Sequence, residues 1–271
     1  MKILATDLDR TLLPNGSWPA DPGAIALFNR LTASQDILLV YVTGRNLRLS
    51  EEAISEYGIR HPDVLIGDVG TSIRRYGSNG WLADPGWETH VKQASPRWSA
   101  DAVRQALADI VGVVEQAREH CGPFKQSWYV DHQKKDELLP IIDQRVKGLF
   151  DEVVIYSFDS QSGDGLLDIL PGSATKQTAL EYIADEFGVP RNEVVFCGDS
   201  GNDIFPLTAG FRGVMVRNAD EQLVADVNRA ATRNSALQVY HAKGGLCGLN
   251  GYYTSGVIEG ACHYGVLQAP C

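Results

Sequence analysis

Two aspartates, Asp7 and Asp9, stand one residue apart directly after the short apolar run at residues 3–5. A carboxylate is ionised at neutral pH, so one of the pair could attack an electrophile while the other manages protons. A short apolar run of this kind is typical of a buried strand. The sequence therefore predicts that both aspartates lie where a buried strand ends.

Three further polar clusters follow apolar runs later in the chain. They are Thr43, Gly44 and Arg45 after residues 36–42, Lys176 after residues 166–171, and Asp199, Asn202 and Asp203 in "GDSGND" after residues 194–197. If these runs are neighbouring strands of one parallel sheet, their carboxyl ends meet at the edge where such sheets bind ligands. We therefore expect all four clusters to form one site.

The charges of this expected site indicate what it binds. Its four carboxylates belong to Asp7, Asp9, Asp199 and Asp203. They would repel one another strongly unless a divalent cation neutralised them, and oxygen ligands suit Mg²⁺. A lysine, a threonine hydroxyl and glycine-rich turns offer the positive charge and N–H groups that a phosphoryl group needs. The residues favour chemistry on a phosphate ester.

Strand and helix signals alternate in the first and last parts of the chain. Residues 2–6 and 36–42 are typical of strands, and a helix over 21–34, with Asp21 as its N-cap, is predicted between them. A hairpin with its turn at 77–80 follows. This alternation predicts an α/β fold with a doubly wound, Rossmann-like parallel sheet.

The pattern changes in the middle of the chain. There the sequence predicts a helix over 99–120, a strand over 124–130, a helix over 136–149 and a strand over 152–158. Such pieces would make a separate small α+β unit. We therefore predict a catalytic core formed by residues 1–81 and 166–271, with an inserted cap domain at residues 82–165.

Composition limits the partners of the protein. A formal net charge of −10 over 271 residues opposes binding to nucleic acid or to an anionic membrane. No apolar run approaches the ~18 residues of a membrane span, and Asp7 comes too early for a signal peptide. We expect a cytoplasmic monomer that acts on a small molecule. The five cysteines lack paired spacing and are expected to be free thiols, with Cys197 as a core residue.

The motifs "DLDRT", "TGR", Lys176 and "GDSGND", in that order, resemble those of the haloacid dehalogenase superfamily of phosphatases. Lys176 lies 133 positions after Thr43, and an insertion of this length resembles that superfamily's type-2 cap. Three more stretches, at 63–73, 124–130 and 248–266, resemble the sucrose-phosphate phosphatases and related sugar-phosphate phosphatases. The resemblance implies a phosphoric monoester hydrolase.

The resemblance also implies roles for the motif residues. Asp7 would be the nucleophile that forms an aspartyl-phosphate, and Asp9 would be the general acid and base. Thr43 and Lys176 would hold the phosphoryl oxygens. Mg²⁺ would be held by Asp7, the Asp9 backbone carbonyl and Asp199, with Asp203 either as a further ligand or as a support for the ligands. Arg10 stands where the superfamily often has Gly or Asn. Strand alternation would direct it away from Asp7 and Asp9, and we expect it to be a structural surface residue.

Discrimination among sugar phosphates must come from groups around the leaving sugar. Besides Thr43 and Lys176, the residues expected to contact substrate are Gly44, Arg45, Lys125, Ser127, the 157–162 stretch and Asn202. We predict sucrose 6-phosphate as the preferred substrate, and the nearest alternative is another disaccharide or glycoside phosphate, such as mannosylfructose phosphate. A sugar phosphomutase and a non-catalytic sugar-phosphate binder are the other two classes.

Three more residues, two in the inserted segment and one just after it, have alternative interpretations. Asp168 lies among apolar residues, where an aspartate is either a paired structural group or a support for the cap hinge. The neighbours Trp128 and Tyr129 are more typical of a core than of a ligand platform.

Overall fold

The strands of the described residues form two β-sheets, and the larger sheet has eight strands. In the computed structural model, which describes residues 1–33, 36–158 and 162–271, its strands are β1 (Lys2–Thr6), β2 (Ile37–Val42), β3 (Val64–Gly67), β4 (Ser72–Gly77), β5 (Gly80–Ala83), β10 (Val194–Gly198), β11 (Arg212–Met215) and β12 (Gln238–His241). Their order is β12-β11-β10-β1-β2-β3-β4-β5, parallel as far as β3 and antiparallel at β4 and β5. The predicted parallel core and the hairpin at 77–80 are confirmed.

Helices cover both faces of this sheet. They are α1 (Ala24–Ala33), α2 (Leu47–Tyr57), α3 (Pro85–Ala94), α6 (Lys176–Glu186), α7 (Ile204–Thr208), α8 (Glu221–Arg233) and α9 (Thr254–His263). Side chains alternate along a strand, so Leu4 packs with α1, α2 and α9 on one face, while Ile3 and Ala5 pack with α3, α6, α7 and α8 on the other. Because β1 pairs with both β2 and β10, the carboxyl ends of these three strands lie side by side.

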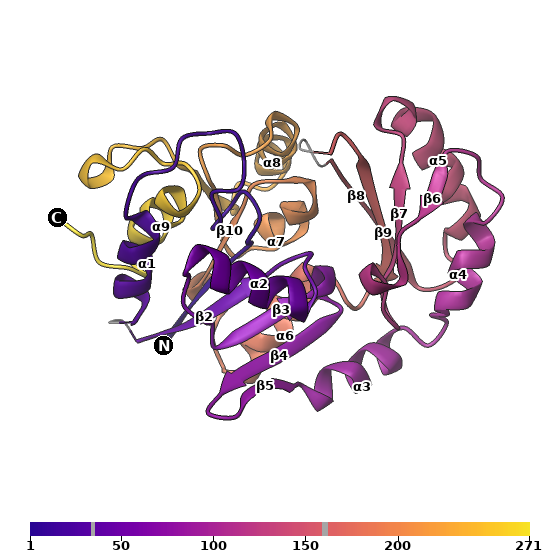
Figure 1. The fold of residues 1–271 in the computed structure, drawn as a ribbon, viewed down its shortest axis with the longest axis horizontal. Coiled ribbons are helices and arrows are strands. Elements are labelled where there is room, and N and C mark those ends of the chain that lie inside the picture. The colour runs from indigo at the N-terminus through magenta and orange to yellow at the C-terminus, as the bar shows by residue number, and fades with distance from the viewer. Residues whose placement is uncertain (34–35, 159–161) are drawn as a thin grey trace.

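A second, smaller sheet lies to one side of the first (Figure 1). Its strands are β6 (Val113–Glu115), β7 (Gln126–Val130), β8 (Glu152–Phe158) and β9 (Gly165–Pro171), in the antiparallel order β6-β7-β9-β8. The helices α4 (Ala100–Leu107) and α5 (Lys135–Val146) pack against one face of it. Side chains on its other face, among them Tyr129 and Asp168, line a cavity.

The apolar run 166–171 was expected in the larger sheet, and this is wrong. It forms β9, which pairs with β7 and β8. An apolar run can be buried in either sheet, and its pairing partners are distant in sequence. The segment 82–165 also contains α3, which packs Trp87 and Val91 into the core of the larger sheet.

The predicted helix over 99–120 is too long. The helix α4 ends at Leu107, Gly112 takes a φ of 90°, and the β-branched Val113 and Val114 enter β6. A short 3-10 turn at Arg118–His120 completes the stretch.

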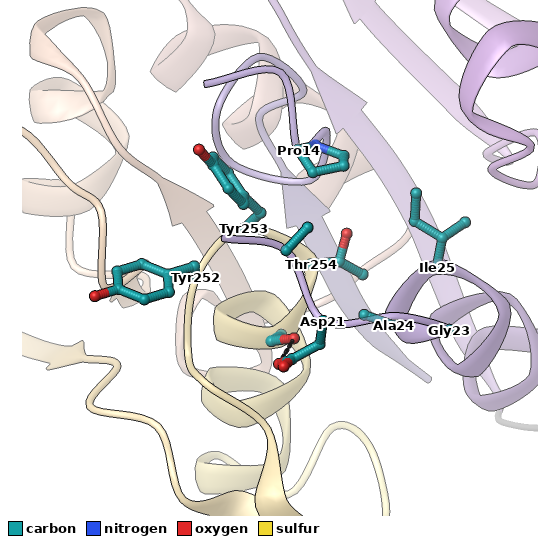
Figure 2. A pocket seen from close by; sticks show the side chains of 10 residues that line it. Pro14, Asp21, Gly23, Ala24, Ile25, Tyr252, Tyr253 and Thr254 are labelled. Carbon is teal, nitrogen blue, oxygen red and sulfur yellow. Dashed lines mark hydrogen bonds between the residues drawn. The ribbon is translucent and has the colours of Figure 1, made fainter. Parts of the chain in front are cut away.

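Asp21 does not cap α1 as predicted, because that helix begins at Ala24. Its Oδ2 instead accepts hydrogen bonds from the Asn250 N–H and the Ser255 hydroxyl, both at 2.7 Å. These bonds tie the N-terminal loop to the start of α9, beside a small pocket of about 80 Å³ (Figure 2).

The expectation that all cysteines are free thiols is wrong for two of them. Cys247 and Cys271 form a disulfide with a Cα–Cα distance of 5.8 Å. The two cysteines are 24 positions apart in the sequence, and the chain between them folds so that they meet. The sequence spacing of the cysteines alone does not predict this pairing. Within the described chain Cys121, Cys197 and Cys262 remain free, and Cys197 is buried as predicted.

Among the described helices, none combines the length and the apolar character needed to cross a membrane.

Candidate active site

Asp7 and Lys176 contact each other where β1 and α6 meet. Asp7 follows β1, and Lys176 is the first residue of α6; both are buried. Lys176 Nζ donates hydrogen bonds to Asp7 Oδ1 at 2.8 Å, to Asp203 Oδ1 at 2.8 Å and to Asn202 Oδ1 at 2.9 Å. Thr175 caps α6 and so fixes the turn from which Lys176 projects. The structure thus brings these four predicted residues together.

Burial and charge shift the pKa values of these groups. Burial raises the pKa of Asp7 to about 7, and Lys176 offsets only part of this effect. Burial also raises the pKa of Asp199 well above its usual range. Burial alone would lower the pKa of Lys176, but the carboxylates of Asp203 and Asp7 outweigh it and raise that pKa. The lysine is therefore firmly charged, whereas Asp7 and Asp199 hold protons more tightly than usual.

Three carboxylates form a set of donors that fits a divalent cation. Asp7, Asp199 and Asp203 each offer one oxygen, and these oxygens lie within 4.8 Å of one another. Asp199 Oδ1 accepts a hydrogen bond from the Thr11 hydroxyl at 2.9 Å, whereas its buried Oδ2 accepts no hydrogen bond from the described residues and is ion-paired with Arg10, whose Nη2 lies 3.1 Å away. Hard oxygen donors of this kind suit Mg²⁺.

Asp203 accepts hydrogen bonds both from Lys176 and from the loop that contains Asp199. Its Oδ1 accepts from Lys176, and its Oδ2 accepts from the N–H groups of Asp199 and Ser200 at 3.0 and 3.2 Å. Gly198 is packed so closely that a Cβ there would lie 2.6 Å from Asp203 Cγ. Asp203 therefore holds the loop that presents Asp199.

Asp7, Lys176, Asp199 and Asp203 together form the floor of the site, and Asp9 is held beside this floor by two neighbours. Arg45 Nη2 lies 2.6 Å from Asp9 Oδ1 and Arg45 Nε lies 2.9 Å from Oδ2, while Asn15 Nδ2 donates to Oδ1 at 2.7 Å. The hydrogen bonds to Asp9 raise the pKa of Arg45. Arg45, which was expected to contact substrate, is thus already paired with the predicted acid–base residue.

Thr43 follows β2 and is fully buried. Its N–H donates to Ile66 O at 2.8 Å, and its hydroxyl oxygen accepts from the Arg45 N–H at 3.2 Å. These bonds fix the loop in which Gly44 and Arg45 reach the cavity wall.

A cavity of about 510 Å³ lies between this floor and the smaller sheet. Asp7, Asp9 and Asn202 line it from the larger sheet, and Lys125 and Asp168 line it from the smaller one. This volume falls within the usual range for small-molecule sites, about 300–1,000 Å³. The site therefore has room for a substrate with an anionic end and a polar end.

The smaller sheet forms what we call the cap side of the cavity. A polar group on this side consists of Lys125, Ser127 and Asp168. Ser127 Oγ donates to Asp168 Oδ1 at 2.5 Å, and Lys125 Nζ lies 3.9 Å from the same oxygen. Ser127 is 1% exposed and lies behind Asp168, whereas Lys125 and Asp168 reach the cavity wall. Asp168 is therefore a paired group that also faces the cavity.

Several residues on the cavity wall were missed by sequence reasoning. Tyr129 faces the cavity and only Trp128 is in the cap core, since neighbouring strand residues point to opposite faces. His120 and Gln116 also line the cavity, and no motif distinguished them.

The 157–162 stretch was expected to contact substrate. Ser157, Phe158 and Ser162 of this stretch line the cavity, while 159–161 lie outside the described residues.

The expectation that Arg10 is a structural surface residue is wrong. Its Nη2 lies 3.1 Å from Asp199 Oδ2 and 3.3 Å from Asp220 Oδ2. Strand alternation does not extend to this position, because Arg10 has a φ of 56°. The left-handed turn directs the side chain back toward the acidic group.

The fold and this arrangement of acids, lysine and threonine define a haloacid dehalogenase superfamily phosphatase, a phosphoric monoester hydrolase, and solved haloacid dehalogenase-type structures share the fold. A family model described as sucrose-6F-phosphate phosphohydrolase matches residues 1–265. The chain therefore belongs to that family.

Individual relatives and one solved structure are also similar to this chain. A haloacid dehalogenase-like hydrolase from Nitrosococcus oceani is 37% identical over 97% of this chain and 71% of its own length. Sucrose-phosphatase 1 from Nicotiana tabacum is 33% identical over 89% of this chain, which spans 55% of the tobacco protein. The sucrose-phosphatase structure from Synechocystis sp. PCC6803, in complex with sucrose and phosphate, has a TM-score of 0.79 at 23% identity and covers 98% of both chains.

Proposed function

We propose that the protein hydrolyses sucrose 6-phosphate to sucrose and phosphate in a Mg²⁺-dependent reaction. The observation that carries the proposal is the contact between Lys176 and Asp7, on the floor of a cavity whose opposite wall is polar. A nucleophile and a fixed positive charge meet there beneath a space large enough for a sugar. The family match and the sucrose complex of the Synechocystis relative support this choice of substrate.

In the first step an Asp7 carboxylate oxygen attacks phosphorus. The bond between phosphorus and the sugar oxygen breaks, and Asp9 donates a proton to that oxygen, so sucrose leaves and an aspartyl-phosphate remains. Lys176 and Thr43 hold the other phosphoryl oxygens and balance the charge that develops on them.

In the second step Asp9 acts as a base. It takes a proton from a water molecule whose oxygen attacks phosphorus, and the bond to Asp7 breaks to release phosphate. Because Arg45 and Asn15 already bond Asp9, one Asp9 oxygen must turn from Arg45 toward the sugar oxygen in the reacting complex. Arg45 then becomes available to the leaving sugar, in keeping with its expected role in substrate binding.

We further propose that Asp7, Asp199 and the Asp9 backbone carbonyl hold Mg²⁺. When bound, the cation would neutralise these carboxylates and draw electron density from the phosphoryl group. Asp203 keeps both oxygens in hydrogen bonds and orients Asp199 and Lys176.

Selectivity for a disaccharide is assigned to the cap side of the cavity. The floor recognises only the phosphoryl group, which any phosphate monoester carries, so the sugar must be distinguished by Lys125, Asp168 and the core residues Gly44 and Asn202. Ser127 contributes by holding Asp168. The nearest alternative is another disaccharide or glycoside phosphate, such as mannosylfructose phosphate.

A substrate panel tests the proposal. The protein is incubated with Mg²⁺ and, separately, sucrose 6-phosphate, mannosylfructose phosphate, glucose 6-phosphate and fructose 6-phosphate, and released phosphate is measured. We expect the highest kcat/KM for sucrose 6-phosphate. Preference for a monosaccharide phosphate would overturn the choice of substrate, and a phosphate moved to another hydroxyl would indicate a mutase. Binding without either product would indicate a non-catalytic binder.

A further inference from the structure

A strained turn follows β3. Asp68, Val69 and Gly70 have φ angles of 52°, 61° and 108°, all in the left-handed region. This conformation costs an L-residue roughly 1–2 kcal/mol, and a β-branched residue such as valine adopts it only exceptionally. Strain of this kind persists only where the surrounding structure imposes it, and it gathers at functional sites.

Backbone hydrogen bonds join this turn to residues 43–45, which we call the phosphoryl-binding loop. The Val69 N–H donates to Thr43 O at 3.0 Å, and the Asp68 N–H donates to Arg45 O at 2.9 Å. The position of the turn and the position of Thr43 are therefore linked.

The turn also lies directly against the start of α6. A Cβ added at Gly70 would lie 2.1 Å from the Thr175 carbonyl carbon and 2.5 Å from Lys176 N, so no side chain fits there. The Trp87 indole N–H donates to Gly70 O at 3.2 Å and holds the turn in this place. Lys176 is thus positioned against the same turn as Thr43.

The Val69 side chain contacts the smaller sheet. It is 1% exposed and packs with Ile155 of β8 and Leu170 of β9, with Val153 beside them. Val69 also contributes to the lining of the 510 Å³ cavity. One residue therefore joins the strands of the cap to the backbone that positions Thr43 and Lys176.

We propose that Val69 is a positioning residue that couples the placement of the cap strands β8 and β9 to the phosphoryl-binding groups, and so sets selectivity for esters whose sugar reaches the cap. The inference rests on the proposed function and adds a specificity determinant to it. A sugar phosphate spans both sides of the contact, so losing the contact misaligns its two ends. An ester without a sugar touches only the floor and does not depend on it.

Val69→Ala tests this coupling, because it removes the side-chain contact and keeps an L-residue in the turn. Val154→Ala is the matched control: it deletes the same atoms from the opposite face of β8, where Val154 packs with the cap core. For Val69→Ala we expect kcat/KM for sucrose 6-phosphate to fall about tenfold, mainly through KM, while kcat/KM for p-nitrophenyl phosphate changes less than about twofold. Val154→Ala should leave the ratio of the two values unchanged.

A second variant separates coupling from strain. Val69→Gly relieves the left-handed strain and also lacks the contact, so we expect it to lose selectivity at least as much as Val69→Ala. Equal losses on both esters in the Val69 variants, or recovered selectivity in Val69→Gly, would overturn the inference. Failure of the proposed function is recognised separately with the wild-type protein, which would then prefer a monosaccharide phosphate or release no phosphate from any ester of the panel.

Discussion

Arg10 Nη2 lies 3.1 Å from the buried Oδ2 of Asp199, the carboxylate that we propose as a Mg²⁺ ligand. The backbone of Arg10 is fixed on both sides, because its N–H donates to Asn15 Oδ1 at 2.7 Å and its carbonyl accepts from Asn218 Nδ2 at 2.6 Å. The guanidinium is therefore held beside Asp199. Its positive charge weakens the attraction of this carboxylate for a divalent cation.

This contact predicts that Arg10 weakens cation binding. Replacing it in Arg10→Met should tighten Mg²⁺ binding about tenfold and lower the melting temperature of the cation-free protein, because Asp199 loses its counter-charge. Calorimetric titration with Mg²⁺ and thermal unfolding measure the two effects. Arg10→Lys keeps the charge and should stay near wild type. Equal or weaker Mg²⁺ binding by Arg10→Met would contradict the prediction.

Asp7 and Asp9 should differ in what their amides abolish. Asp7→Asn should reduce phosphate release to background because no nucleophile remains. Asp9→Asn should slow hydrolysis by about 10²–10⁴-fold while sugar-phosphate binding is largely kept, since only proton transfer is lost. Phosphate release and ligand titration check both variants, with circular dichroism as the control for folding. Substantial hydrolysis by Asp7→Asn would sink its assignment as nucleophile.

The floor of the site could be predicted from sequence because its signals are local. Asp7, Thr43 and Asp199 each follow an apolar run, and a parallel sheet necessarily brings the carboxyl ends of neighbouring strands to one edge. Lys176 was placed in the site by its motif and its helix start, although the run before it belongs to the other sheet.

The remaining features depend on contacts that no local pattern specifies. The run 166–171 is equally apolar in either sheet, so only its pairing with β7 and β8 decides where it lies. Arg10 was misjudged because strand alternation was extended past the end of β1 into a left-handed turn. The positive φ of Val69 could not be foreseen either, because valine is among the residues least suited to it.

The raised pKa of Asp7 predicts a pH-dependent effect of Mg²⁺. In the cation-free protein this pKa is about 7, above the ordinary aspartate value of 3.8, so the folded state binds the proton more tightly than the unfolded state. Raising the pH from about 4 to about 7 therefore removes stability that this group contributes. A cation must displace the proton below about pH 7, so the gain in melting temperature from Mg²⁺ should increase with pH through this range. Thermal unfolding with Mg²⁺ or chelator, from about pH 5 to 8, measures the gain.

Asp7→Asn is the control for this pH effect, because an amide has no proton to displace. Its Mg²⁺-dependent gain should be smaller and should vary less with pH. A wild-type gain that is constant across the range would show that Asp7 does not exchange its proton for the cation.

Lys125 should govern selectivity for the sugar. Its ammonium is buried 3.9 Å from Asp168 Oδ1 on the cap side of the cavity, so Lys125→Ala removes a hydrogen-bond donor and leaves Asp168 with less compensating charge. We expect kcat/KM for sucrose 6-phosphate to fall about 10- to 100-fold, whereas hydrolysis of p-nitrophenyl phosphate, which does not reach the cap, should change little. Lys134→Ala, at an exposed lysine of the same cap segment, is the matched control and should behave as wild type.

A double variant separates recognition by Lys125 from simple charge imbalance. Lys125→Met combined with Asp168→Asn removes both charges and keeps similar volumes, so folding stability should recover relative to Lys125→Met alone. If Lys125 donates to a sugar hydroxyl, kcat/KM for sucrose 6-phosphate will be lower in the double variant than in Asp168→Asn alone, because only the double variant lacks the donor. Recovery of activity together with stability would instead mean that Lys125 acts only by holding Asp168, and selectivity would then belong to other residues of the cavity wall.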